Sequence, residues 1–244
     1  MMKKVKFGLF IMLFMFSLLA AEDYEQKINR SFTLTASGSI ELANINGEIM
    51  ITTTKGSAID IKAVKKSDYK GEIESVEIIF ESGQDSLKVY TKYNKKNTRA
   101  KVDFTVAIPE KMNRALFKSV NGRIDCSGKF ADLSLKSVNG KIKFAGDFAS
   151  ATLSAVNGTV DVSQEAPLQG DLAVETVNGG IDIEISRKSA FSLEGSTVNG
   201  SIDCEFPVSV QRHFIGSSLK GQVNGGGHTV EVETVNGRIS ISKI

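Results

Sequence analysis

Residues 119–126 read Ser-Val-Asn-Gly-Arg-Ile-Asp-Cys, and residues 137–144 read Ser-Val-Asn-Gly-Lys-Ile-Lys-Phe. The same pattern recurs along most of the chain. From Asn121 the Asn-Gly pairs follow one another at steps of 18, 18, 21, 21, 25 and 12 residues. Asn-Gly occurs at Asn46, Asn121, Asn139, Asn157, Asn178, Asn199, Asn224 and Asn236.

The residues around each asparagine follow a pattern of their own. The preceding residue is always Val or Ile, and in seven of the eight copies the third residue after the asparagine is Ile or Val. The fifth residue after it is mostly apolar, as are the fourth and sixth before it. The Asn224 copy departs from the pattern. A period near 20 residues with β-branched residues at regular positions is typical of stacked β-structure.

The repeat predicts an all-β fold: a single-domain β-solenoid of ~18–21-residue coils, closed by an N-terminal antiparallel β cap. We expect each Asn-Gly to form a corner, with the Val or Ile on both sides of it pointing inward. Glycine should supply a left-handed backbone there, and the asparagine amides should stack in a hydrogen-bonded ladder.

A chain of hairpins is the rival interpretation, because Asn-Gly favours two-residue hairpin turns. Such a hairpin would pair the residue before the asparagine with the one two places after it. The first is always apolar and the second mostly polar, as in Glu48, Arg123 and Lys141, so both faces of the hairpin would be mixed. A bulged hairpin with a longer loop remains an alternative.

The first 21 residues have the features of a secretory signal peptide. Lys3, Lys4 and Lys6 precede an apolar run over residues 7–19, and Ala20-Ala21 follows. The run is shorter than the about 20 residues that span a membrane. We expect export to the periplasm, the cell surface or the medium, with cleavage after Ala20 or Ala21.

The predicted domains are a signal peptide over 1–21 and one continuous domain over 22–244. Within that domain, residues 22–112 form an N-terminal coil and β cap, and residues 113–244 form the regular coils. Alternating strands are expected at 59–63, 76–80, 87–90 and 102–106, with a turn at 83–85.

Charge excludes one class of partner. The chain has 30 Lys and Arg against 28 Asp and Glu, and three of the lysines lie in the first six residues. The processed chain therefore has a net charge near −1. This balance argues against a nucleic-acid-binding surface.

With these features in place, the chain resembles a known family. The order is a leader, paired strands, the strand Val-Asp-Phe-Thr-Val-Ala-Ile-Pro at 102–109, and tandem Val-Asn-Gly-x-Ile coils. It is similar to the exported bacterial "putative adhesin" family of unknown function, which resembles the autotransporter-adhesin head domain. The resemblance implies a β-solenoid in the cell envelope and no catalytic residues.

Two cysteines and an acidic column are candidate sites. Cys126 and Cys204 hold the same inward position four coils apart, about 19 Å at ~4.8 Å per coil, so we expect free thiols rather than a disulfide. The fourth residue after the asparagine is Asp125, Asp161, Asp182 and Asp203, interrupted by Lys143, with Ser240 in the last copy. The sequence leaves open whether this column binds a cation or is a solvated face.

Residues 92–101 hold the densest basic run, which either binds acidic glycans or lipid head groups or forms a solvated loop. His213 and His228 lack cysteines at zinc-ligand spacing. No catalytic, cofactor-binding or metal-binding residues are assigned, and no cofactor is expected.

The sequence favours a non-enzymatic envelope or surface binding module whose partner is a glycan or a surface protein. The alternatives are an envelope-stress or assembly component that binds a protein, and a polysaccharide-active β-helix enzyme. Self-association through the solenoid ends, around 238–244, is a further expectation.

Overall fold

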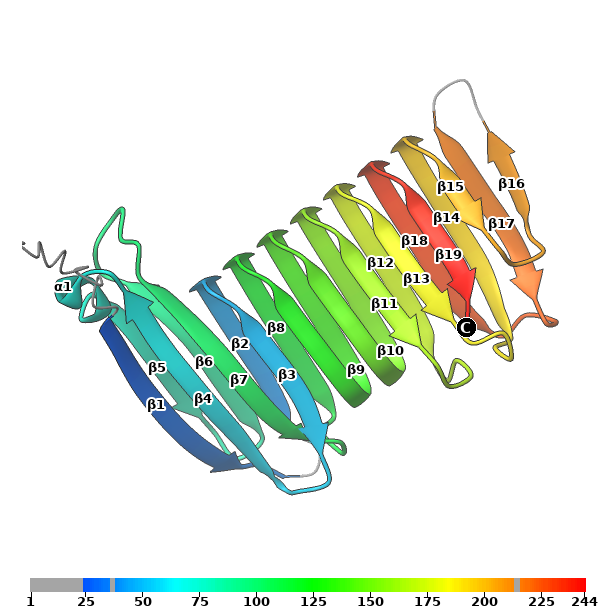
Figure 1. The fold of residues 1–244 in the computed structure, drawn as a ribbon. Coiled ribbons are helices and arrows are strands. Elements are labelled where there is room, and N and C mark those ends of the chain that lie inside the picture. Colours follow the sequence, from blue (N-terminus) through cyan, green and yellow to red (C-terminus); the bar gives the residue numbers. More distant parts are fainter. Residues whose placement is uncertain (1–23, 36–37, 213–215) are drawn as a thin grey trace, which may run out of the picture.

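The computed structural model describes residues 24–35, 38–212 and 216–244, and it is all-β apart from one short helix, α1 (Lys70–Ile73). The strands lie side by side in one long row (Figure 1). Their bounds are β1 Tyr24–Thr33, β2 Ser39–Asn46, β3 Ile49–Thr54, β4 Ala58–Ser67, β5 Val76–Ser82, β6 Ser86–Tyr93, β7 Lys101–Pro109, β8 Arg114–Asn121, β9 Ile124–Asn139, β10 Ile142–Asn157, β11 Val160–Gln164, β12 Asp171–Asn178, β13 Ile181–Ile185, β14 Phe191–Asn199, β15 Ile202–Cys204, β16 Ser209–Arg212, β17 Ser217–Val223, β18 His228–Asn236 and β19 Ile239–Lys243.

The central repeats stack in parallel register, as in a solenoid. Ile124 pairs with Ile142, Ile142 with Val160 and Val160 with Ile181, so each repeat lies directly beside the next. Asn121 pairs with Asn139 in the same way. The hairpin alternative is therefore wrong, because hairpins would pair these segments antiparallel.

Each repeat contributes to two walls that enclose the core. The strand before the asparagine lies in one wall and the strand after the glycine in the other, and β9 and β10 run on through a bend at Gly128 and Gly146. The residues of both walls that face inward are almost completely buried, including Leu135 and Phe144. This burial of apolar side chains stabilises a fold with few local contacts.

Both terminal repeats lie inside the stack rather than at its ends. β18 pairs with β12 on one side and with β14 on the other, and β19 lies between β13 and β15. Likewise β2 lies between β6 and β8, and β3 between β7 and β9. The expectation that residues 238–244 form an exposed end is therefore wrong.

Antiparallel strands flank the parallel repeats. β1, β4 and β7 pair antiparallel at the N-terminal side, and β5 pairs with β6 through the turn predicted at residues 83–85. At the other end, β17 pairs antiparallel with β14 and with β16. The strands expected at 59–63, 76–80, 87–90 and 102–106 are confirmed as parts of β4, β5, β6 and β7. The predicted signal peptide lies outside the described residues.

Candidate functional site

The corner asparagines form a continuous ladder. Each side-chain amide donates to the Oδ1 atom of its neighbour at 2.8–2.9 Å. The stacking order is Asn46, Asn121, Asn139, Asn157, Asn178, Asn236, Asn199. The predicted ladder is confirmed. Asn224 stands apart from it: with a φ of 50°, it donates to the carbonyls of Arg187 and Ser189.

The corner glycines are needed for space, not for a left-handed backbone. Among the glycines that follow the ladder asparagines only Gly47 has a φ in the left-handed range, at 115°, while Gly225 after Asn224 has a φ of 89°. At Gly140 an added Cβ would lie 2.1 Å from the carbonyl oxygen of Gly122, and at Gly158 it would lie 2.1 Å from that of Gly140. The stacked corners approach so closely that a side chain cannot fit. The prediction of left-handed glycines is wrong at these positions.

The valines before the ladder asparagines point outward, which also corrects the prediction, whereas Val223 before Asn224 is buried. Their exposed fractions run from 39% at Val120 to 51% at Val198. They form a column in the order Val120, Val138, Val156, Val177, Val235, Val198. The residue three places after each asparagine is buried as expected, for example Ile142. The exposed valine column is a feature that the sequence interpretation missed.

Small polar residues occupy the inner side of the corner instead. Asn44, Ser119, Ser137, Thr176, Thr197 and Thr234 are all buried. Each threonine hydroxyl donates to a glycine carbonyl of the adjacent repeat, as Thr176 does to Gly158 at 3.3 Å. The Ser119 and Ser137 hydroxyls are buried without such a partner.

The predicted acidic column is interrupted more often than its sequence order suggests. Because β19 lies between β13 and β15, Ser240 separates Asp182 from Asp203, and only Asp161 and Asp182 are neighbours. Basic residues two places after a corner asparagine, in the same or the adjacent repeat, pair with several of these aspartates. The ion pairs are Arg123–Asp125 at 2.7 Å, Arg238–Asp203 at 2.9 Å and Lys141–Asp161.

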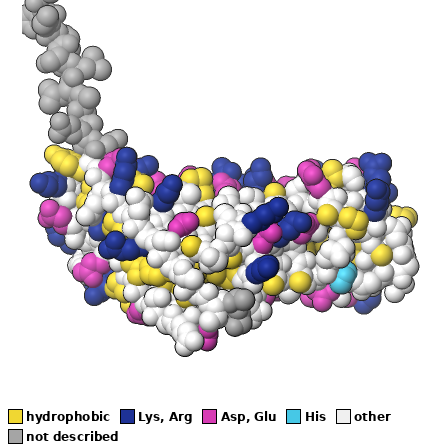
Figure 2. Space-filling view, turned by 90° about the horizontal axis from the view of Figure 1, so that it is seen from below, with side chains coloured by type: hydrophobic (Ala, Val, Ile, Leu, Met, Phe, Trp, Pro, Cys, Tyr) yellow, Lys and Arg dark blue, Asp and Glu magenta, His cyan; other side chains and the backbone are white. Residues whose placement is uncertain are grey.

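Ion pairs therefore involve three of the four aspartates of this column. Within the described residues, no group of three or more His, Cys, Asp or Glu side chains could hold a metal ion. Figure 2 shows basic and acidic side chains interspersed along the molecule. His213 lies outside the described residues, and His228 is exposed, 3.8 Å from Asp171.

Both cysteines are free thiols, as predicted. They lie five repeats apart rather than four, because the C-terminal repeat comes between them. Burial raises the pKa of the Cys126 thiol well above its usual 9.0, and it also raises the pKa of Cys204. Cys126 is buried, whereas Cys204 is only half-buried.

The basic run borders a groove at the Asn46 end of the ladder. We call it the ladder-end groove. It has a volume of about 700 Å³. It is lined by Asn46, Gly47, Lys66, Ser67, Asp68, Thr98, Arg99, Lys101 and Asn121. Three of these side chains are cationic and one is anionic, and two further carboxylates contact the lining: Asp103 pairs with Lys66, and Glu72 accepts hydrogen bonds from Ser67 and from the backbone N–H of Arg99. Sequence reasoning identified Arg99 and Lys101 but not Lys66, which β4 brings in from a distant part of the chain.

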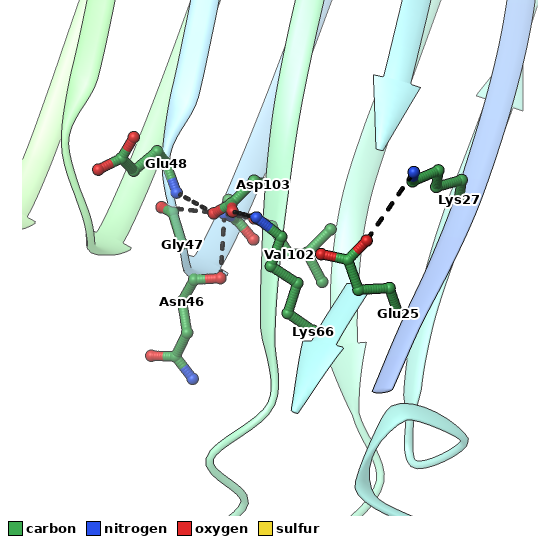
Figure 3. A network of polar contacts seen from close by, with 9 residues as sticks. Glu25, Lys27, Asn46, Gly47, Glu48, Lys66, Val102 and Asp103 are labelled. Atoms are coloured by element: carbon green, nitrogen blue, oxygen red, sulfur yellow. Dashed lines mark hydrogen bonds and ion pairs between the residues drawn. The ribbon is translucent and has the colours of Figure 1, made fainter. Parts of the chain in front are cut away.

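Asp103 fixes the position of Lys66 beside the groove (Figure 3). The Lys66 ammonium lies 3.1 Å from Oδ2 of Asp103, and Oδ1 of Asp103 accepts a hydrogen bond from the backbone N–H of Glu48 at 3.0 Å. This hydrogen-bonded ion pair raises the pKa of Lys66, so the ammonium stays charged. Within the described chain, the charged groups of Arg99 and Lys101 form no ion pair.

The ladder ends at the groove with a donor. Oδ1 of Asn46 accepts from Asn121, while Nδ2 of Asn46 has no acceptor among the described residues. The Asn44 side chain holds the corner from inside by donating to the carbonyls of Asn46, Gly47 and Val102. The groove therefore offers one amide donor and two cations without an ion pair in the described part of the chain, whereas the hydroxyls of Ser67 and Thr98 already bond the carboxylate of Glu72. Such groups suit an anionic, hydroxyl-rich ligand.

None of the described helices is long and apolar enough to cross a membrane.

Comparison with one solved structure shows the same fold. A "putative cell adhesion protein" from Clostridium sporogenes aligns over 91% of this chain and 100% of its own, with 12% identity and a TM-score of 0.52. A "putative adhesin" from Bacteroides fragilis aligns over 90% of this chain and 97% of its own, with 12% identity and a TM-score of 0.36. Among curated proteins, no sequence match is found. The sequence profile of the Toastrack family, DUF4097, matches residues 35–242, and the chain is therefore a member of that family.

Proposed function

We propose that the chain is an exported, non-enzymatic binding module of the cell envelope, and that it holds an anionic glycan in the ladder-end groove. Residues 1–21 serve as its signal peptide, cleaved after Ala20 or Ala21. The 18–21-residue repeats provide a stiff support, and the antiparallel strands at its N-terminal side act as a cap that protects the core and the strand edges.

The observation that carries the proposal is the charge and hydrogen-bonding capacity of the groove. Among the residues that the structure describes, Arg99 and Lys101 form no ion pair, whereas Asp103 neutralises Lys66, and Asn46 presents an unused amide donor beside them. Carboxylate or phosphate groups on a sugar polymer would bind the cations, and the sugar hydroxyls would bind the neutral polar groups. The names of the structural neighbours, which refer to adhesion, agree with a surface role.

Binding of soluble polymers to the purified protein tests this proposal. We expect saturable binding to polygalacturonate, which carries carboxylates, or to a poly(glycerol phosphate), and none to neutral dextran of similar length. Binding should weaken with added salt, because the contacts are between exposed charges.

Two double variants that remove the same amount of charge test whether the polymer binds in the ladder-end groove. Arg99→Gln with Lys101→Gln should weaken binding by about tenfold or more, since it removes two unpaired cations. Lys62→Gln with Lys188→Gln removes the same charge at exposed positions away from the groove and should leave affinity nearly unchanged. Equal binding of dextran, or an equal loss in both double variants, would refute the groove as the site.

A further inference from the structure

One wall of the solenoid presents a regular face to solvent, with a groove between Val156 and Glu233. Its strands pair in the order β5, β6, β2, β8, β9, β10, β12, β18, β14, β17, β16. β10 is the middle strand of this order, with five on either side. We call the outward side of this wall the valine face, because the exposed valine column runs across six of its strands.

The valine column is an unbroken apolar stripe. Its six members are 39–51% exposed, and Val156 on β10 lies in the middle region of the row. A single exposed valine is unremarkable, but an aligned row with side chains of one kind marks a surface suited to association.

The neighbouring outward column carries an antisymmetric pattern of charge. The residues three places before the asparagines run, in stacking order, Lys118, Lys136, Ser154, Glu175, Glu233 and Ser196. The two lysines lie on one side of Ser154 and the two glutamates on the other. Lys136 and Glu175 are each one strand from Ser154, and Lys118 and Glu233 are each two strands from it.

This pattern is complementary to itself under a two-fold rotation. An axis parallel to β10, between two facing copies, reverses the direction of stacking but keeps each column opposite its own counterpart. Lys136 then faces the partner's Glu175, and Lys118 faces the partner's Glu233. An axis along the solenoid would instead place like charges at the same level, which is unfavourable.

We propose that two copies of the chain associate through the valine face, with the two-fold axis along β10 and the two solenoids antiparallel. The valine columns pack on each other and the lysine and glutamate columns set the register, as expected for an isologous interface. Lys118 already bonds Glu41 of its own chain at 2.7 Å, which holds its ammonium on this face.

The area of the valine face determines how tightly the two copies are expected to bind each other. Six strands about 4.8 Å apart and five residues along each strand give a footprint on the order of 500 Å². A standard stable interface buries about 800 Å² on each partner, so this dimer should dissociate in the micromolar range. The antiparallel arrangement places the two ladder-end grooves at opposite ends of the particle, which makes it bivalent.

Sedimentation velocity of the purified protein across the micromolar range tests the proposal. We expect a concentration-dependent monomer–dimer equilibrium. Lys136→Glu or Glu175→Lys alone should weaken dimerisation about tenfold or more, because each places like charges opposite each other. The double variant Lys136→Glu with Glu175→Lys exchanges the charges and should restore most of the affinity.

Two further variants complete the test. Val156→Asp near the axis should abolish the dimer, whereas Lys188→Glu, in a turn away from the face, should leave it unchanged. Circular dichroism verifies that each variant is folded. A monomer at every concentration, or a double variant as weak as the single ones, would overturn the interface. The polymer-binding assay is independent of this result, because a monomer retains its groove.

Discussion

The side-chain amide of Asn236 donates a hydrogen bond of 2.8 Å to Asn178, although 58 residues separate them in the chain. On its other side Asn236 accepts a hydrogen bond from Asn199 at 2.8 Å. β12 and β14 therefore each pair with β18, which comes last but one in the chain. The C-terminal repeat is an interior part of the fold.

Truncating the chain before residue 228 should consequently abolish the cooperative unfolding of the C-terminal third, because β12 and β14 would lose their shared partner. A milder form of the experiment is Ile239→Ala. Ile239 is fully buried, so the free energy of unfolding should fall by about 2–5 kcal/mol in urea denaturation. Ile244→Ala, at a position 39% exposed, is the control and should change it by less than about 0.5 kcal/mol. Similar values for the two variants would contradict the interior placement.

Gly140→Ala should destabilise the protein by about 3 kcal/mol, the upper range for overpacking, because the new Cβ would lie 2.1 Å from the Gly122 carbonyl oxygen. Gly71→Ala is the matched control. Nothing lies within 4 Å of a Cβ at that helical position, and alanine there should stabilise by about 0.4–1 kcal/mol. Thermal unfolding of both variants measures the difference. If Gly140→Ala is as stable as the parent protein, neighbouring corners can move apart without lowering the stability of the fold.

The buried serines and threonines on the inner side of the corners hold the same position in successive repeats, so the effects of substituting them on stability can be compared. The Ser137 hydroxyl is buried without a partner, so Ser137→Ala should leave stability unchanged or raise it by up to about 1 kcal/mol. Thr176→Val removes the hydrogen bond to Gly158 at constant shape and should lower the free energy of unfolding by about 1 kcal/mol. If Ser137→Ala lowered the free energy of unfolding more than Thr176→Val, the Ser137 hydroxyl would have to be hydrogen-bonded and the Thr176 hydroxyl not.

The two thiols should differ in reactivity. In the native protein at mildly alkaline pH, Cys204 should be alkylated before Cys126, because Cys126 is the more deeply buried and its pKa lies well above 9.0. Since folding raises both pKa values, the unfolded chain releases these protons first, and stability should fall as pH rises above about 8.5. Mass spectrometry of time-quenched samples measures the order. The double variant Cys126→Ala with Cys204→Ala should lose the part of the alkaline decline that arises from the thiols.

The repeat predicted the parallel stacking and the asparagine ladder because both follow from local periodicity. The direction of the valines could also have been deduced. Positions four and six before the asparagine are buried, so alternation along a strand places the second position inward and the first outward. Val138 therefore had to be exposed, and Ser137 buried, in any strand that buries Leu135.

Other features could not be predicted from the local sequence pattern. Nothing near Asn236 in the sequence indicates that it lies between Asn178 and Asn199, because the three repeats fit one another equally well at their corners. The hairpin of β16 and β17 occupies the outer edge of β14, and β18 pairs at its inner edge. Lys66 joins the groove for a similar reason: β4 pairs with β7, a partner distant in sequence.

The interior position of β18 and β19 also affects how the protein is made. A ribosome delivers the repeats around Asn121, Asn139 and Asn157 in the order in which they stack, so each can add to the one before it. The slot between β12 and β14 stays open until the last 17 residues have been synthesised. An incomplete chain thus cannot finish folding, and under the proposed export this delay keeps the chain from closing before it has crossed the membrane.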